Sequence, residues 1–284
     1  MPQNKKKRVD ILGALILEIV IFCIVLFLGL FSAIEARKVI TQENIEISKI
    51  GFEGFLSYFV LATLIILLVI YIPKIKKYQA KIYKFFFLFS SLFGTLIVLS
   101  VFLPDMFSVP LILLLFILWL KLRSVLIHDI LIILALAGLG SFFGLAIEPR
   151  TVILLLLVLS FYDFIAVYKT KHMLKMASSM LKSGAIMGII IPQKLKDFKA
   201  NINQVKPGGK FMVLGGGDIV FPLIFSVSML GTGFFPALVV ALFSMFGLAV
   251  SLIIFMLQKE KNPIPALPPI ALFSIIGYII TLII

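Results

Sequence analysis

The chain has 284 residues, of which 62% are hydrophobic, and its mean hydropathy is +1.19. A composition this apolar excludes an ordinary soluble domain, so lipid must be the solvent for most of the chain. The formal net charge of +13 comes from bases that lie between apolar runs, with no basic face carrying interleaved aromatic residues. The charge therefore indicates topology and contact with membrane lipids rather than nucleic-acid binding.

The first predicted span covers residues 11–33 and follows four bases at positions 5–8. Its apolar part is too long for a signal peptide, so we interpret it as an uncleaved span. Glu18 lies near its middle, where a packing role or a polar contact with another helix is expected. Cys23, the only cysteine of the chain, cannot form an internal disulfide.

Nine spans are predicted, which makes the chain an all-α polytopic membrane protein. A transmembrane helix needs about 20 apolar residues. The apolar runs that meet or approach this length are 11–33, 52–72, 84–103, 106–120, 125–147, 151–168, 211–230, 234–257 and 267–284. The run 106–120 is short, but it is free of charge and we count it as a span.

One transmembrane domain is expected over residues 1–284. Its parts are six spans over about 11–168, a loop over about 169–210, and three spans over about 211–284. If the spans alternate in direction, 22 of the 26 bases lie on the side of the N-terminus and 4 lie on the other side. Because cytoplasmic loops are enriched in Lys and Arg, we predict a cytoplasmic N-terminus and an extracytoplasmic C-terminus in a cell membrane.

Two histidines and one further acid carry no recognisable metal site. His128 and His172 lie far apart in sequence, and neither has a metal-ligand spacing. Asp129, beside His128, is six residues past Arg123 and is expected near enough to the interface to be solvated. The sequence predicts no metal and no cofactor.

The connection 169–210 is the one long loop, and loops of this length are usually functional or disordered. It is basic, and it contains the apolar stretch 185–191, which we expect to lie against the membrane or to fill a groove. The sequence leaves open whether this loop is cut for activation.

Two aspartates lie inside apolar runs, where a charged side chain costs about 2.5 kcal/mol or more and indicates a functional site. Asp163 is six residues before Lys169, which is about 9 Å of helix, and Asp218 is eight residues after Lys210, which is about 12 Å. The two spans are consecutive and antiparallel, so both carboxyl groups are predicted at a similar depth near the same face.

Two carboxyl groups in contact share one proton, so one is ionised and one is neutral. The ionised group can activate a water, and the neutral group can protonate the carbonyl oxygen or the leaving amine. This is the chemistry of an aspartic protease. The alternative interpretation is a helix-terminal role, because Asp218 follows three glycines at a possible helix start and could act as an N-cap.

Two flanking segments extend this site. Gly215, Gly216 and Gly217 precede Asp218, and glycine allows another backbone to come close. The segment 262–269 has four prolines, which oppose a regular helix and favour extended backbone at the start of the last span. That start is on the same side as both aspartates, although a simple proline-rich helix start is the alternative.

The ordered motifs resemble those of the presenilin and signal peptide peptidase family of intramembrane aspartyl proteases. The motifs are Tyr162-Asp163 in the sixth span, Gly215-Gly216-Gly217-Asp218 as GxGD in the seventh, and Pro265-Ala266-Leu267 as PAL at the ninth. Nine spans with a long loop between the sixth and seventh also match. The inferred orientation is that of presenilin, and the lack of long polar insertions resembles the archaeal members.

The resemblance implies a presenilin-like fold and hydrolysis of peptide bonds within the transmembrane helices of substrate proteins. It implies that Asp163 and Asp218 are catalytic, that Tyr162 and the glycines at 215–217 shape the site, and that Pro265, Ala266 and Leu267 help to hold substrate. Two alternatives remain open: a type IV prepilin-like GxGD peptidase, and an ion channel or proton-linked transporter that uses the two aspartates. The sequence predicts neither the natural substrate nor the oligomeric state.

Overall fold

A computed structural model describes residues 2–46, 49–71, 78–169, 180–181, 184–205, 210–258 and 263–283. The described residues form nine α-helices, three short 3-10 helices and one pair of strands. In chain order, the elements are α1 (Pro2–Gln42), α2 (Phe52–Tyr71), α4 (Gln79–Phe102), α5 (Asp105–Leu122), α6 (Val125–Ala146), α7 (Pro149–Tyr168), β1 (Gly188–Pro192), η1 (Leu195–Lys199), η2 (Ile202–Gln204), β2 (Phe211–Gly215), α9 (Gly216–Ser228), η3 (Met229–Gly231), α10 (Phe234–Leu257) and α11 (Leu267–Ile283).

The helices agree with the predicted spans, including the short run 106–120, which becomes α5. Six of the described helices are long and apolar enough to cross a membrane, and two shorter apolar helices cover 216–231 and 267–283. The mostly helical fold is thus confirmed, with one correction. The predicted seventh span, 211–230, begins as strand β2, and the helix begins only at Gly216. Several of the bases counted on the side of the N-terminus, among them Lys74, Lys76 and Lys77, lie outside the described residues. So do His172 and the Pro-Gly-Gly segment 207–209 of the long connection.

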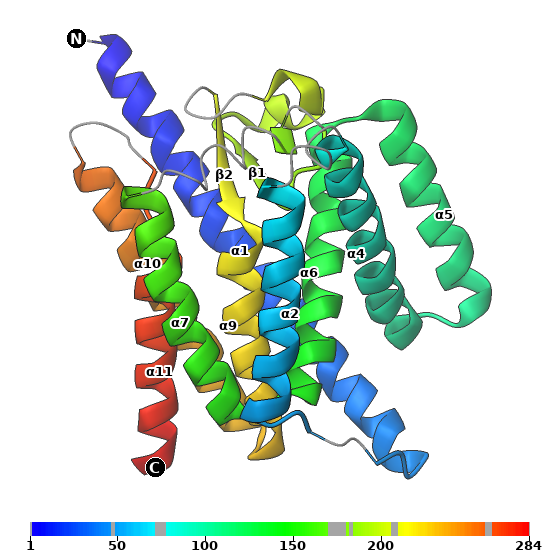
Figure 1. Ribbon diagram of the computed structural model, residues 1–284. Helices are drawn as coiled ribbons and strands as arrows, with labels where there is room; N and C mark the ends of the chain where they lie inside the picture. The colour runs from blue at the N-terminus through cyan, green and yellow to red at the C-terminus, as the bar shows by residue number, and fades with distance from the viewer. Residues whose placement is uncertain are drawn as a thin grey trace.

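Helix α9 lies at the centre of the bundle, beside α1, α6, α7, α10 and α11 (Figure 1). Helices α4 and α5 extend the bundle on the side of α6, whereas α7, α10 and α11 group on the other side. The N-terminus and both strands lie at one end of the bundle, and the C-terminus lies at the opposite end. This central position gives α9 contacts with every helix that contributes to the site described below.

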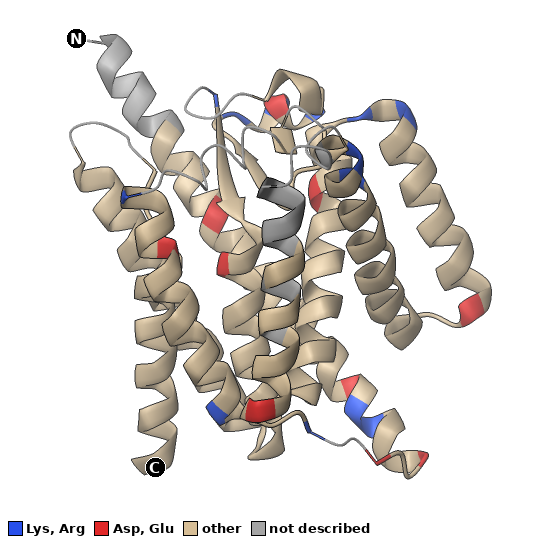
Figure 2. Cartoon of the chain, in the orientation of Figure 1, with Lys and Arg blue, Asp and Glu red and all other residues tan. Residues whose placement is uncertain are grey.

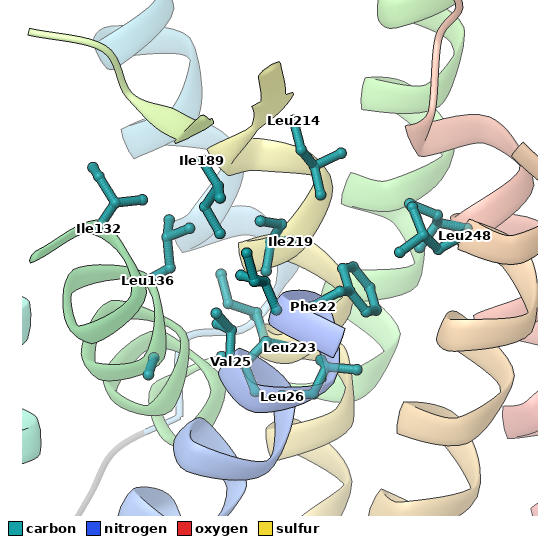
Figure 3. Packing of buried hydrophobic residues seen from close by; sticks show 14 of the residues in the cluster. Phe22, Val25, Leu26, Ile132, Leu136, Ile189, Leu214, Ile219, Leu223 and Leu248 are labelled. Carbon is teal, nitrogen blue, oxygen red and sulfur yellow. The ribbon is translucent and has the colours of Figure 1, made fainter. Parts of the chain in front are cut away.

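The core around α9 is built from aliphatic and aromatic side chains, and Figure 3 labels some of those from α1, α6, α9, α10 and both strands. Leu223 of α9 is fully buried and fills a groove lined by Gly29 of α1 and Gly140 of α6. A Cβ atom at Gly29 or Gly140 would lie 2.5 Å or 2.4 Å from a Leu223 methyl carbon, so both positions need glycine for this close approach. Small residues at helix interfaces are the usual means of tight packing in membranes.

Buried hydroxyl groups connect these helices at two points. The Ser141 hydroxyl of α6 donates to the Gly29 carbonyl of α1 over 2.6 Å. The Ser226 hydroxyl of α9 donates to the Ala237 carbonyl of α10, also over 2.6 Å. Such bonds have no competing water in the bilayer core, and each fixes the rotation of one helix against its neighbour.

The connection between α7 and α9 folds back over the start of α6. Its apolar stretch 185–191, expected at the membrane or in a groove, includes most of β1 and is largely buried in the protein. Further along, the Val125 N–H donates to the Ala200 carbonyl and the Ile202 N–H donates to the Arg123 carbonyl. The loop is therefore fastened to α6 and covers its first turns.

Candidate active site

Helix α7 supplies Asp163 near its end on the side of the strands. The side chain is 7% exposed, and its carboxylate accepts a hydrogen bond from the backbone N–H of Leu267, at the start of α11. Its Oδ2 atom has no partner among the residues that the structure describes. Asp163 is thus held by one backbone donor while one of its oxygens stays free for another ligand.

Helix α9 supplies Asp218 in its first turn. Gly215 is the N-cap residue, and Asp218, three positions later, is 8% exposed and accepts a hydrogen bond from the Gly215 N–H. A side chain that reaches back from the third helical position to the N-cap N–H is one half of a capping box. Asp218 is therefore not the N-cap residue itself, but it does help to close the helix start.

The two aspartates are close enough to interact electrostatically, and α7 contacts α9 directly. Figure 2 shows the acidic positions of α7 and α9 at a similar level, near the end of the bundle that carries the strands. The predicted juxtaposition of Asp163 and Asp218 is present. The distance in space from Lys210 to Asp218 is longer than in a continuous helix, because residues 211–215 are extended.

A third carboxyl group belongs to the same neighbourhood. Glu18 of α1 is 5% exposed, its Oε2 atom has no partner in the described part of the chain, and it interacts electrostatically with Asp218. The polar neighbour that the sequence left unnamed for Glu18 is thus Asp218. Sequence reasoning could not find this, because nothing in the first span indicates which helix faces it.

The proline-rich segment reaches the site through its backbone. Residues 263–266 are not helical, and α11 begins at Leu267. Pro265 and Leu267 are buried, and Ala266 is half-buried. The prediction of a non-helical segment over 262–269 is confirmed for 263–266 and wrong for Leu267, Pro268 and Pro269, which form the first turn of α11, and the segment brings the Leu267 N–H to Asp163.

The other predicted residues differ in how they face the aspartates. Gly215 donates to Asp218, as above, and a Cβ atom at Gly216 would lie 2.9 Å from the Met187 carbonyl oxygen. Gly217 lies between Gly216 and Asp218 in the first turn of α9. The Tyr162 side chain is 58% exposed at the helix surface, so it is available to a molecule in the membrane rather than buried against Asp163.

A strand pair, which sequence reasoning missed, leads directly into this site. Strands β1 and β2 are antiparallel, with Ile190 opposite Val213 and Gly188 opposite Gly215. The signal was present: the run Gly-Ile-Ile-Ile-Pro is β-branched and bounded by glycine and proline, which is typical of a short strand.

The two edges of this sheet are not equivalent. The Ile190 N–H points away from β2, because it donates to the Asp129 carboxylate over 2.9 Å. Directly opposed residues of an antiparallel pair either bond each other or both point outward, so Val213 presents its N–H and C=O away from β1. The outer edge of β2 thus lies next to Gly215, whose N–H meets Asp218.

The structure corrects the prediction for Asp129. It is 2% exposed, and its neighbour His128 is fully buried, so neither is solvated at the interface. The cause is the returning loop, which places β1 over the first turns of α6. Among the described residues, no group of three or more His, Cys, Asp or Glu side chains could hold a metal ion.

The comparisons with known proteins agree with one another. Residues 17–284 match the family described as signal-peptide peptidase, presenilin aspartyl protease. A solved structure of a presenilin family intramembrane aspartate protease in space group C222 is 22% identical, with a TM-score of 0.57 over 92% of this chain and 94% of that one. A second, in space group P2, is 24% identical, with a TM-score of 0.56 over 93% and 96%. At these identities the structures support the fold alone, and no curated protein matches the chain.

Proposed function

Because this chain belongs to the signal peptide peptidase and presenilin family of aspartyl proteases, we propose that Asp163 and Asp218 are the two catalytic carboxyl groups of this intramembrane protease. The observation that carries the proposal is the electrostatic contact of these two buried side chains at the meeting of α7, α9 and α11. The family cleaves transmembrane substrates, and this chain is itself a multi-pass membrane protein.

The chemistry follows from a pair that holds one proton. The ionised carboxylate removes a proton from a water molecule, and the oxygen of that water attacks the carbonyl carbon of the scissile bond. The neutral carboxyl group gives its proton to the carbonyl oxygen, which forms a tetrahedral diol. The diol then collapses: the carboxyl group that took the water proton gives it to the leaving nitrogen as the C–N bond breaks, and the other carboxylate takes the proton of a diol hydroxyl, so the pair again holds one proton.

Hydrolysis of a labelled transmembrane helix by the purified protein in lipid vesicles tests this function. A transition-state analogue that mimics the diol should block it. Ion flux measured in the same vesicles addresses the transporter alternative, in which flux would persist when the analogue is bound and no cleavage would occur. Cleavage blocked by the analogue is the result we expect.

We infer that the substrate is unwound before it is cut, and that its freed backbone pairs with β2. A transmembrane helix keeps its N–H and C=O groups in internal hydrogen bonds, and groups released inside a bilayer need new partners. The outward N–H and C=O of Val213 offer such partners by strand addition. Val213 is itself an exposed residue, at 38%.

The segment Pro265-Ala266-Leu267 is proposed to fix Asp163 for this substrate. We expect Pro265→Ala to lower the rate of cleavage by about two- to fivefold, because loss of the ring frees the backbone that carries the Leu267 N–H to Asp163. Leu267→Ala keeps that N–H but removes a buried side chain, a change that costs about 2–5 kcal/mol in a packed core. Because the lost packing lets the start of α11, and with it the Leu267 N–H, move away from Asp163, we expect the larger loss of activity per folded molecule for Leu267→Ala.

Leu272→Ala is the matched control, because Leu272 lies in the same helix and is 58% exposed. Rates are compared at equal amounts of folded protein, judged by thermal unfolding in detergent. Cleavage close to wild type in both Pro265→Ala and Leu267→Ala would leave residues 265–267 as an ordinary helix start.

The orientation is proposed from charge. Most blue segments lie at the strand end of the bundle, around the loops and the ends of α4 and α5, with some red segments among them; fewer blue segments lie at the opposite end, beside red ones (Figure 2). Together with the 22-to-4 distribution of bases, this supports a cytoplasmic N-terminus and active site, and an extracytoplasmic C-terminus.

A labelling experiment in intact cells checks the orientation. In a Cys23→Ser background, we expect an impermeant thiol reagent to label Arg150→Cys and not Lys210→Cys. Arg150 is at the start of α7, far from the strands, and Lys210 immediately precedes β2. Labelling of Lys210→Cys alone would reverse the assigned direction.

A further inference from the structure

We propose that His128 and Asp129 are positioning residues, which act as a substitute for a third strand and hold β1 so that β2 stays in register beside Asp218. The inference rests on the proposed use of the β2 edge by substrate. Both residues lie in the first turns of α6, outside the aspartate pair, and both are buried. Both make polar contacts with β1, about 60 residues farther along the chain, and His128 also bonds the backbone of Ile186, just before that strand.

The side chains of His128 and Asp129 bond the edge of β1 that faces away from β2. The Asp129 Oδ1 atom accepts from the Ile190 N–H over 2.9 Å, and His128 Nε2 lies 3.4 Å from the Gly188 carbonyl oxygen. A carbonyl can only accept, so the imidazole donates through Nε2. Residues 188 and 190 are two apart, so both groups emerge on the same edge of β1. A neighbouring strand would offer the same things, an acceptor for an N–H and a donor for a C=O.

The part of the bundle that carries His128 and Asp129 is firmly packed. The His128 ring stacks on Phe87 of α4, with centroids 5.2 Å apart and planes within 5° of parallel. Phe87 stacks in turn on Trp119 of α5, with centroids 4.9 Å apart. Helix α6 itself packs against α1, α4 and α9, and it has the largest buried share of the six long apolar helices. The strand edge is thus fixed to a firm part of the bundle.

Strand β1 is connected to Asp218 through β2. Strand β1 fixes β2 through their shared ladder, and the last residue of β2, Gly215, both caps α9 and donates to Asp218. A slip of one residue between strands would turn every inward group outward. The N–H of Val213 would then face β1 instead of the substrate. Loss of the contacts to β1 should therefore alter where the substrate is cut, as well as how fast.

The test uses paired variants of the full-length protein in lipid vesicles, with a labelled transmembrane helix as substrate and mass spectrometry of the products. Asp129→Asn keeps an acceptor for the Ile190 N–H, whereas Asp129→Leu removes it at similar volume. We expect Asp129→Leu to lower kcat about tenfold and to spread cleavage over neighbouring peptide bonds, as loss of one buried hydrogen bond allows. Asp129→Asn should cleave at the wild-type positions, within about threefold of the wild-type rate.

The second pair is His128→Gln, which keeps an N–H donor, and His128→Phe, which keeps the stacking on Phe87 but has no donor. This pair decides the matter if Asp129→Leu yields too little folded protein. A double-mutant cycle of Asp129→Leu with Ile190→Pro completes the design, because the proline removes the N–H that points to Asp129 and no N–H of the strand ladder.

Three results would overturn the inference: unchanged cleavage positions in both apolar variants, equal impairment of Asp129→Asn and Asp129→Leu, or additive losses in the cycle. Each of them can occur while Asp163→Asn and Asp218→Asn are inactive, so the inference can fail while the proposed catalytic pair stands. An Asp163→Asn or Asp218→Asn variant that still cleaves would instead contradict the proposed function.

Discussion

Asparagine in place of Asp163 or Asp218 is expected to abolish cleavage of a transmembrane substrate while the protein stays folded. The pair works only if one group can take a proton and the other can give one, and an amide does neither. General acid–base catalysis contributes about 10²–10⁴-fold to a rate, so each single variant should fall to the background of the assay. The volume of the side chain is unchanged, and asparagine can still accept the hydrogen bonds from Leu267 and Gly215.

The measurement is the initial rate of product formation in vesicles, with the thermal unfolding midpoint as the check on folding. Asp105→Asn is the matched control, because Asp105 is an exposed acid in the first turn of α5. The double variant should be no worse than either single one, since the two groups act as one unit. A folded single variant that keeps most of its activity would remove that residue from the catalytic pair.

Proline at Val213 is expected to lower cleavage at least about tenfold, through loss of one backbone donor and obstruction of the approaching chain. The N–H of Val213 points away from β1, so the proline removes no hydrogen bond between the strands. Only the outward-facing positions of an edge strand allow an N–H to be removed without loss of a hydrogen bond between strands. The change acts on the free edge and leaves the ladder in place.

Two variants bracket this result. Val213→Ala keeps the N–H and should cleave within about twofold of wild type. Met212→Pro removes an N–H that faces Ile191, so it should destabilise the strand pair and give a broader loss. Binding of a small transition-state analogue, which needs only the aspartates, should survive Val213→Pro. Wild-type cleavage by Val213→Pro would show that the substrate does not use this edge.

Much of the fold was predictable because apolar length and the side on which bases lie are strong signals in membrane proteins. The short run 106–120 is an example: its length alone was marginal, but the charge pattern required it, and it is α5. The seventh span failed for a physical reason. Residues 211–215 are apolar whether they form a buried strand or a helix, and periodicity cannot separate the two over so short a run.

The sequence predicted which residues lie together in the site, but not which contacts they make with one another. Sequence depth placed Asp163, Asp218 and the proline-rich segment at one face. It could not indicate that the Leu267 N–H would meet Asp163, because that depends on how α11 sits against α7. Asp129 was misplaced for a related reason: depth counted from Arg123 takes no account of a loop that folds back and buries the start of α6.

The short length of α9 has a consequence for water. Residues 216–231 include α9 and η3, and at 1.5 Å per residue they reach about 24 Å, whereas the hydrocarbon layer is about 30 Å thick. At one end the helix gives way to β2 just before Asp218, and we expect the deficit to fall there. Hydrophobic mismatch of this kind is relieved by local thinning of the bilayer, and exposed backbone groups need hydrogen-bond partners. We therefore expect headgroups and water to come closer to the two carboxyl groups than they would beside a full-length helix, which shortens the path of the water that the reaction consumes.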